Sequence, residues 1–292
     1  MSNLRNFQIQ DKSTNSSESV RRKFGAGVIT EKMQVCGSGL GYLPIALVLV
    51  SCGTFIGSYV IAVLKKDIAA YFPYISDTGT KPPESCIFGQ FLNIAATIAF
   101  CTMYIRYKLV ESLTGHEDGR LRRLNKAGLV LGILSSLGLS IVANFQETVV
   151  EPVHLTGASL VLGCGVLYEF LQTFLTYHMY PEFNGQFIAR VRLVLSVISA
   201  VSMVTAFTSA GISRYQTDTK DKLHWKPSEK GFDAHIVSTI SEWITAVLFL
   251  FFFFTYVRDF QKVRVEVNAK LCVRHLDEQP LHIPDERSPL LA

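Results

Sequence analysis

The sequence predicts an all-α polytopic membrane protein, with six transmembrane helices in one bundle and both termini in the cytosol. Three observations predict this class. Of the 292 residues, 49% are hydrophobic and only 18% are charged, whereas about 25% are charged in a typical soluble domain. The apolar residues gather in six segments, each long enough for a helix to cross a hydrocarbon core of about 30 Å. Lys and Arg are concentrated in alternate loops.

The six segments follow one another along the chain and are separated by polar loops. The first is not a cleavable signal peptide, because it follows a polar tail of about 40 residues and is longer than a signal h-region. Glycines in the first, third and fourth segments favour close helix packing within the bundle. The sixth ends in four phenylalanines, residues 251–254, which predicts a lipid-facing or peripheral helix. The expected spans are 43–64, 87–105, 127–143, 154–177, 191–212 and 237–257.

The distribution of basic residues predicts the orientation. The two tails and the second and fourth loops hold 19 of the 28 Lys and Arg residues, whereas the first, third and fifth loops hold 8. Because Lys and Arg are enriched on the cytosolic side, we expect both tails to be cytosolic and the odd-numbered loops to face a lumen or the exterior. We divide the chain into a disordered cytosolic tail, a membrane domain and a second cytosolic tail, at 1–40, 41–264 and 265–292.

Two ion pairs are expected inside the membrane domain, where an unpaired charge is costly. Glu169 lies near the cytosolic end of the fourth span, and Arg192 lies near the cytosolic start of the fifth. Arg214 ends the fifth span on the luminal side, and Glu242 lies about one and a half turns inside the sixth. We expect Glu169 to pair with Arg192, and Arg214 with Glu242, so that both pairs hold the bundle together. The alternative is a transport pathway, but these groups lie near the ends of the spans.

The three luminal loops hold the most unusual polar residues of the chain. The first of them, residues 73–85, is rich in Pro, Gly, Asp, Ser and Thr, so it cannot continue either neighbouring helix. All three loops lie on one face of the bundle, and we expect them to form a polar cap that binds a ligand or partner. Trp225 or Trp243 would supply an apolar platform, and the carboxylates would orient the ligand. The alternative is a set of well-capped helix ends. The polar cap consists of Asp77, Glu84, Asn144, Gln146, Glu147, His154, Trp225, His235, Glu242 and Trp243.

The sequence offers no catalytic residues, cofactor or metal site. Asp77-Thr78-Gly79 occurs once, whereas an aspartic protease needs two carboxylates that share a proton. Glycine-rich phosphate-binding motifs and the nucleophile elbow of hydrolases are absent, and no nucleic-acid partner is expected. Of the 6 cysteines only Cys86 lies near the lumen, so we expect neither a disulfide framework nor a Cys/His metal site.

Several motifs occur in order along residues 40–264. The longest covers 73–89 and contains Pro-Tyr-Ile-Ser-Asp-Thr-Gly-Thr, Pro-Pro-Glu-Ser and Ile-Phe-Gly; the others lie at 103–108, 141–147, 225–230, 235–243 and 259–261. Together they resemble the motifs of the damage-regulated autophagy modulator (DRAM) family. The resemblance implies a non-enzymatic, six-span protein of lysosomal or endosomal membranes that modulates autophagy and stress-linked cell death. The long amino tail and Glu169 depart from the family pattern.

The wider superfamily of this family includes proteins that remodel or distribute membrane lipids. The resemblance therefore also implies an alternative function, in which a lipid-remodelling or lipid-transport protein acts through the polar cap. The expected partners are then the lipid bilayer and, for the alternative function, a lipid ligand.

The end of the chain carries an acidic dileucine pattern. Glu286 lies four residues before the paired leucines, Leu290 and Leu291. Clathrin adaptors read such patterns on flexible cytosolic tails, so we expect an adaptor as a partner and the lysosomal membrane as the destination. The endosomal and plasma membranes are alternative locations.

The acidic lysosomal lumen suggests a role for two histidines of the polar cap. The reference pKa of histidine is about 6.5, so an exposed His154 or His235 would be charged there. Glu147 or Glu242 would then gain a cationic partner, and the polar cap would tighten in acid. The alternative is that both histidines only cap helix ends.

Overall fold

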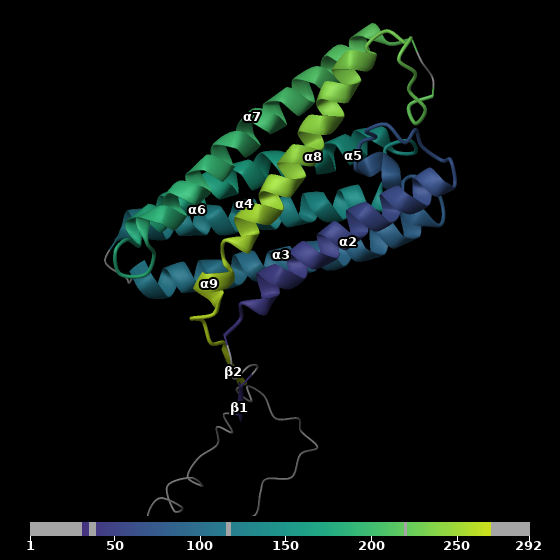
Figure 1. Cartoon of the computed structure of the whole chain (residues 1–292). Helices are drawn as coiled ribbons and strands as arrows, with labels where there is room; N and C mark the ends of the chain where they lie inside the picture. Colours follow the sequence, from purple (N-terminus) through teal and green to yellow (C-terminus); the bar gives the residue numbers. More distant parts are fainter. Residues whose placement is uncertain (1–30, 35–38, 115–117, 219–220, 270–292) are drawn as a thin grey trace, which may run out of the picture. The chain divides into compact units, whose positions relative to one another are not determined.

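The protein divides into two compact units. Its structure, a computed structural model, describes residues 31–34, 39–114, 118–218 and 221–269 (Figure 1). The helical unit ends at residue 264, and the described residues of the other unit are 31–34 and 265–269.

The helical unit confirms the all-α fold, because six helical segments are long and apolar enough to cross a membrane. Each contains the corresponding expected span and continues a few residues into its polar flanks. The first three are α2 (Tyr42–Leu64), α3 (Glu84–Thr114) and α4 (Gly119–Asn144). The fourth joins α5 (Glu151–Ser159), the π-helical segment η2 (Leu160–Cys164) and α6 (Gly165–His178). The fifth is α7 (Gln186–Gln216), and the sixth joins α8 (Phe232–Phe254) to the short α9 (Val257–Phe260).

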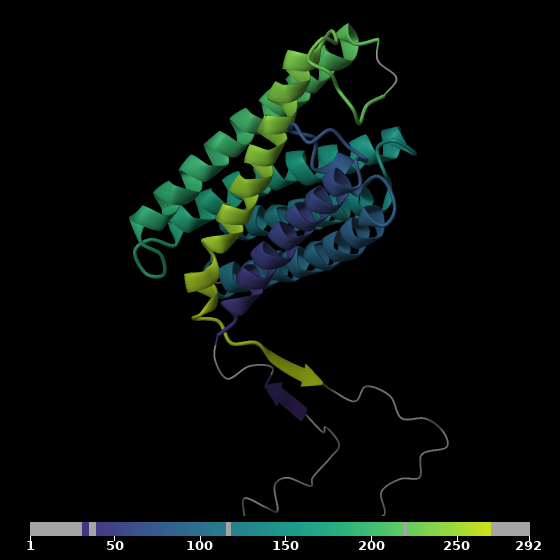
Figure 2. The same cartoon turned by 45° about the vertical axis from the view of Figure 1, so that its right-hand side comes forward.

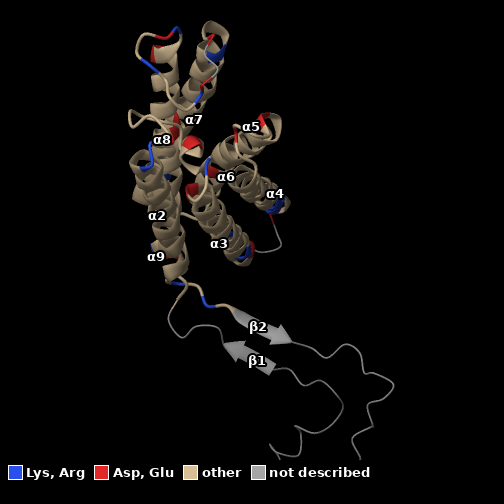
Figure 3. Ribbon diagram, turned by 90° about the vertical axis from the view of Figure 1, so that its right-hand side faces the viewer, with Lys and Arg blue, Asp and Glu red and all other residues tan. Residues whose placement is uncertain are grey.

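The helices lie side by side in one bundle, and its two ends differ. We call the end that carries the loops 65–83, 145–150 and 217–231 the cap end, and the opposite end the tail end. Helices α7 and α8 run alongside each other in both Figure 1 and Figure 2. Figure 3 shows Lys, Arg, Asp and Glu gathered mostly toward the ends of the helices, with few in between. This distribution is typical of a helical bundle that crosses a lipid bilayer.

Glycines bring α4 close to the fourth span, as expected. A Cβ added to Gly138 would lie 2.6 Å from the backbone nitrogen of Val161, and one added to Gly157 would lie 2.7 Å from the side chain of Ile141. Only glycine fits at such a crossing. The first span differs from expectation, because a Cβ added to Gly53 or Gly57 would have no neighbouring atom within 4 Å. Their small size is therefore not used for packing inside the helical unit.

The phenylalanines at the end of α8 only partly follow the expectation of a lipid-facing helix. Phe251 and Phe254 are more than half exposed. Phe252, in contrast, is fully buried and meets Tyr256 edge to face, with ring centroids 5.7 Å apart. One side of this aromatic run therefore belongs to the core.

The second unit contains a pair of short strands. β1 (Glu31–Gln34) pairs antiparallel with β2 (Glu266–Ala269), with Glu31 opposite Ala269. Residues 31–34 thus form a strand, where the sequence predicts part of a disordered tail. Most of the two predicted tails, including Glu286, Leu290 and Leu291, lies outside the described residues.

Candidate functional site

The first loop of the cap end folds into the bundle. Its centre is the 3₁₀ turn η1 (Ser76–Gly79), and all four of its residues are buried. Asp77 accepts a hydrogen bond from the backbone N–H of Tyr74 (3.3 Å), which fixes the turn. The hydroxyl of Thr78 lies 2.8 Å from that of Ser58 on α2. Gly79 is required, because a Cβ there would lie 2.4 Å from the ring of Phe88.

Helix α8 holds this loop in place by three hydrogen bonds. The hydroxyl of Tyr74 donates to Ser238 (2.8 Å), and the backbone N–H of Ile75 donates to the Glu242 carboxylate (2.9 Å). The indole N–H of Trp243 donates to the carbonyl of Pro73 (2.9 Å). Trp243 therefore fastens the loop to α8 and does not line the cavity described next.

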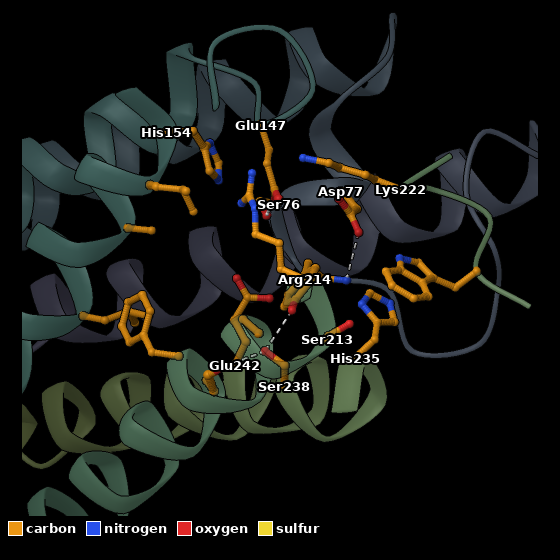
Figure 4. A pocket seen from close by; sticks show the side chains of 18 of the residues that line it. Ser76, Asp77, Glu147, His154, Ser213, Arg214, Lys222, His235, Ser238 and Glu242 are labelled. Carbon is orange, nitrogen blue, oxygen red and sulfur yellow. Dashed lines mark hydrogen bonds between the residues drawn. The ribbon is translucent and has the colours of Figure 1, made fainter. Parts of the chain in front are cut away.

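A cavity of about 160 Å³ opens among these elements (Figure 4). We call it the polar chamber. It is bounded by the first loop, the third loop, α5, the start of α8, the end of α7 and the fifth loop. Six residues of the predicted polar cap line it, from three loops and two helices: Asp77, Glu147, His154, Trp225, His235 and Glu242.

The remaining residues of the predicted polar cap lie elsewhere. Glu84 is buried at the start of α3, 3.7 Å from the ammonium of Lys65. Asn144 exchanges hydrogen bonds of 3.1 Å with Asn93, which join α4 to α3. The carbonyl of Gln146 accepts from the backbone N–H groups of residues 149 and 150 in a turn. These residues hold helix ends together and do not reach the polar chamber.

Three carboxylates meet at the polar chamber, and we call Asp77, Glu147 and Glu242 the carboxylate cluster. The hydroxyl of Ser76 donates to Glu147 (3.3 Å). Burial, and then the charges of Glu147 and Glu242, raise the pKa of Asp77 well above its usual range. The geometry therefore places three carboxyl groups in one partly enclosed space, where a cation would favour their ionised forms.

The basic residues beside the polar chamber are already paired. Arg214 contacts Glu151, and so does Lys222 (2.9 Å). The expected pair of Arg214 with Glu242 does not form, because Glu242 instead accepts from the N–H of Ile75 on the inner side of the loop. Both basic side chains are more than two-fifths exposed and lie at the mouth of the polar chamber.

The two histidines are buried, not exposed as their proposed role in acid requires. Nδ1 of His154 lies 2.7 Å from the carbonyl oxygen of Phe145. The ring of His235 stacks on Trp225, with centroids 4.4 Å apart and an interplanar angle of 14°. Within the described residues, neither forms an ion pair with Glu147 or Glu242. Their contacts are those of packed structural groups.

A second, mostly apolar cavity of about 130 Å³ adjoins the polar chamber. We call it the apolar chamber. Both cavities are bounded by Ser76, His154, Ala158, Leu162 and Glu242, so they meet at these residues. The rest of the apolar chamber lies between the spans and is lined largely by Leu, Phe and Val side chains with Met103. The π-helical segment η2 forms part of its wall, and the carbonyl of its Val161 accepts from Ser135 (3.1 Å). Such segments are frequent at functional sites.

No sequence pattern points directly to the apolar chamber, because most of its lining residues are ordinary membrane-span side chains. Only the convergence of the polar loops pointed toward this end of the bundle. The nearest local signal is the glycine-rich stretch 157–165, which contains η2.

A buried charge cluster lies at the tail end of the bundle. The arginine cluster consists of Arg106, Arg192 and Asp259, and both arginines are 0% exposed. One Asp259 oxygen accepts from Arg106 (3.2 Å) and from Arg192 (2.8 Å). Tyr256 lies against both guanidinium groups, 5.1 Å and 4.6 Å from its ring centroid. The cluster joins α3, α7 and α9.

The arginine cluster replaces the expected pair of Arg192 with Glu169. The short α9 brings Asp259 under Arg192, while the carboxylate oxygens of Glu169 have no hydrogen-bond partner among the described residues. Sequence reasoning missed this arrangement because Asp259 lies just beyond the expected sixth span. The available signal was that Arg106 and Asp259 both belong to the motifs of the chain.

Comparison with known proteins identifies relatives over most of the chain. Residues 39–263 match the family described as Frag1/DRAM/Sfk1/Cwh43P N-terminal domain. The chain is 47% identical to DNA damage-regulated autophagy modulator protein 2 of Homo sapiens over 258 residues, which cover 87% of this chain and 97% of that protein.

More distant relatives are also similar over most of their length. Identity to DNA damage-regulated autophagy modulator protein 1 of Homo sapiens is 39% over 233 residues, covering 80% of this chain and 96% of that protein. Identity to Modulator of macroautophagy TMEM150B of Danio rerio is 32% over 223 residues, covering 76% and 85%. No solved structure matches the chain significantly.

Proposed function

The chain belongs to the Frag1/DRAM/Sfk1/Cwh43P family, and on this premise we propose that it is a non-enzymatic modulator of autophagy and stress-linked cell death in the lysosomal membrane. The observation that carries the proposal is the 47% identity to an autophagy modulator along nearly that protein's whole length. The six spanning helices support a multi-pass location in the membrane.

The proposed topology has both tails in the cytosol and the polar cap in the lumen. The distribution of Lys and Arg supports it. In this orientation Glu286, Leu290 and Leu291 are available to a clathrin adaptor, which would deliver the protein to lysosomes.

The test of this function is autophagic flux in cells that lack the protein and cells to which it has been restored. We expect flux under starvation or DNA damage to fall when the protein is absent and to recover when it returns. Equal flux in both, with the restored protein present in lysosomes, would reject the role in autophagy.

A second candidate function is the binding, transport or remodelling of a membrane lipid. The observation that favours it is the boundary that the polar chamber shares with the apolar chamber. A polar mouth that leads to an apolar space between spans suits an amphipathic molecule. Lipidomic comparison of lysosomes with and without the protein tests this candidate, and unchanged lipid composition would count against transport or remodelling.

A further inference from the structure

We propose that the two chambers together bind a single-chain amphiphile that carries a protonated amine. The amine would lie against the carboxylate cluster, and the start of the chain would enter the apolar chamber past Glu242. This inference rests on the second candidate function, because it names the class of lipid for the same site.

The charge arrangement favours a cationic head. The carboxylates of Asp77, Glu147 and Glu242 all face the polar chamber. Arg214 and Lys222, the basic residues that line it, both contact Glu151 and are exposed at the mouth. A cation that enters from outside can therefore neutralise the cluster without displacing an existing internal ion pair. The raised pKa of Asp77 agrees with this, since burial and the neighbouring carboxylates disfavour its ionised form and a nearby cation would favour it.

The aromatic side chains of the polar chamber favour the same head group. Trp225 and Tyr74 line it, and an ammonium placed over an aromatic face is stabilised by the negative charge of that face. His235 lies between these two rings, with the Tyr74 centroid 5.1 Å away. A carboxylate cluster beside aromatic faces is the usual composition of a site for an organic cation.

An unpartnered hydroxyl points independently to a ligand. Ser213 lines the polar chamber and is only 3% exposed, yet its hydroxyl has no hydrogen-bond partner among the described residues. Buried polar groups are nearly always paired. Figure 4 shows Ser213 among the side chains around the polar chamber. A hydroxyl next to the amine, as in a long-chain amino alcohol, would supply the missing partner.

The position of Glu242 determines where the chain of the ligand must run. Its side chain bounds both chambers, so an amine that contacts this carboxylate lies at their junction. Ala158, a residue with a small side chain, bounds both chambers too. An amphiphile whose amine lies close to the start of its apolar chain would therefore place the amine at Glu242 and the chain in the apolar chamber.

The test measures the binding of two probes to the purified full-length protein in detergent. The probes are sphingosine, which carries a free amine, and N-acetylsphingosine, which has the same chain but a neutral amide. We expect the wild type to bind sphingosine at least tenfold more tightly than N-acetylsphingosine. Glu242→Gln and Asp77→Asn should each weaken sphingosine about tenfold and leave N-acetylsphingosine unchanged. Asp233→Asn, an exposed acid on the same helix as Glu242, is the matched control and should change neither affinity.

The possible outcomes distinguish this inference from the function on which it rests. Equal affinity of the wild type for both probes would overturn the inference and leave lipid binding standing. If neither sphingosine nor N-acetylsphingosine binds, both this inference and the second candidate function are overturned. The comparison of the two probes on the wild type needs no variant, so it decides the question even where a substitution prevents folding.

Discussion

Replacing Asp259 by Asn tests how much the arginine cluster contributes to the stability of the bundle. Asp259 supplies the carboxylate between two fully buried arginines, at 3.2 Å and 2.8 Å. Its removal leaves two guanidinium groups of like charge without a counter-ion, although Asn keeps the shape and one acceptor oxygen. Removing one partner of a buried ion pair typically costs about 3–5 kcal/mol. For a domain of this size, that loss corresponds to a fall in Tm of about 6–20 °C.

The assay is thermal unfolding of the purified protein in detergent, followed by intrinsic fluorescence. Asp233→Asn removes an exposed acid from α8 and should leave Tm nearly unchanged. The double variant Asp259→Asn with Arg106→Gln should lose less than the two single losses combined, because it leaves only one unpaired arginine. If Asp259→Asn melts at the same temperature as Asp233→Asn, the arginine cluster does not stabilise the fold and the reasoning is wrong.

Three further predictions follow from the cap end, the tail and the helix crossing. Because burial raises the pKa of Asp77, the folded state binds a proton that the unfolded state releases, so the stability of the cap end is greatest in acid and falls as pH rises. Hydrogen exchange should therefore show stronger protection of the first loop at pH 5 than at pH 7, and Asp77→Asn should remove this difference. Equal protection of the wild type at both pH values would contradict the prediction. Replacing both Leu290 and Leu291 by Ala should move the protein from lysosomes toward the cell surface in imaging, and an unchanged distribution would reject the sorting signal. Gly138→Ala should lower the free energy of unfolding by about 1–3 kcal/mol through overpacking, whereas Gly53→Ala, with open space around it, should not. Equal thermal stability of the two variants would refute the close crossing of α4 with the fourth span.

The spans were predictable because hydropathy and length alone define a membrane-crossing helix. The meeting of Asp77, Glu147 and Glu242 was also predictable in outline, since alternate loops of a six-helix bundle lie on one face. Their exact partners were not. Burial of η1 inside the bundle depends on Ser58 and Phe88, which come to lie beside it only once the helices have packed.

The ion pairs show the same limit of sequence reasoning. The expectation for Arg192 took the acid near the facing end of the preceding span, Glu169. The fold instead brings Asp259 to Arg192 from 67 residues away, through a short helix that hydropathy does not mark. Pairing inside a bundle is decided by helix rotation and by loop geometry, and neither can be read from composition.

The two proposed functions are joined if the protein modulates autophagy through its two chambers, and blocking the boundary between the chambers tests this most directly. Ala158→Phe would fill the point where the two chambers meet, while Ser159→Phe, on the exposed neighbouring position, adds the same ring outside them. The measurement is autophagic flux in cells that lack the protein and express either variant at equal lysosomal amounts. We expect Ser159→Phe to restore flux and Ala158→Phe to fail to restore it. Full restoration by Ala158→Phe would contradict it.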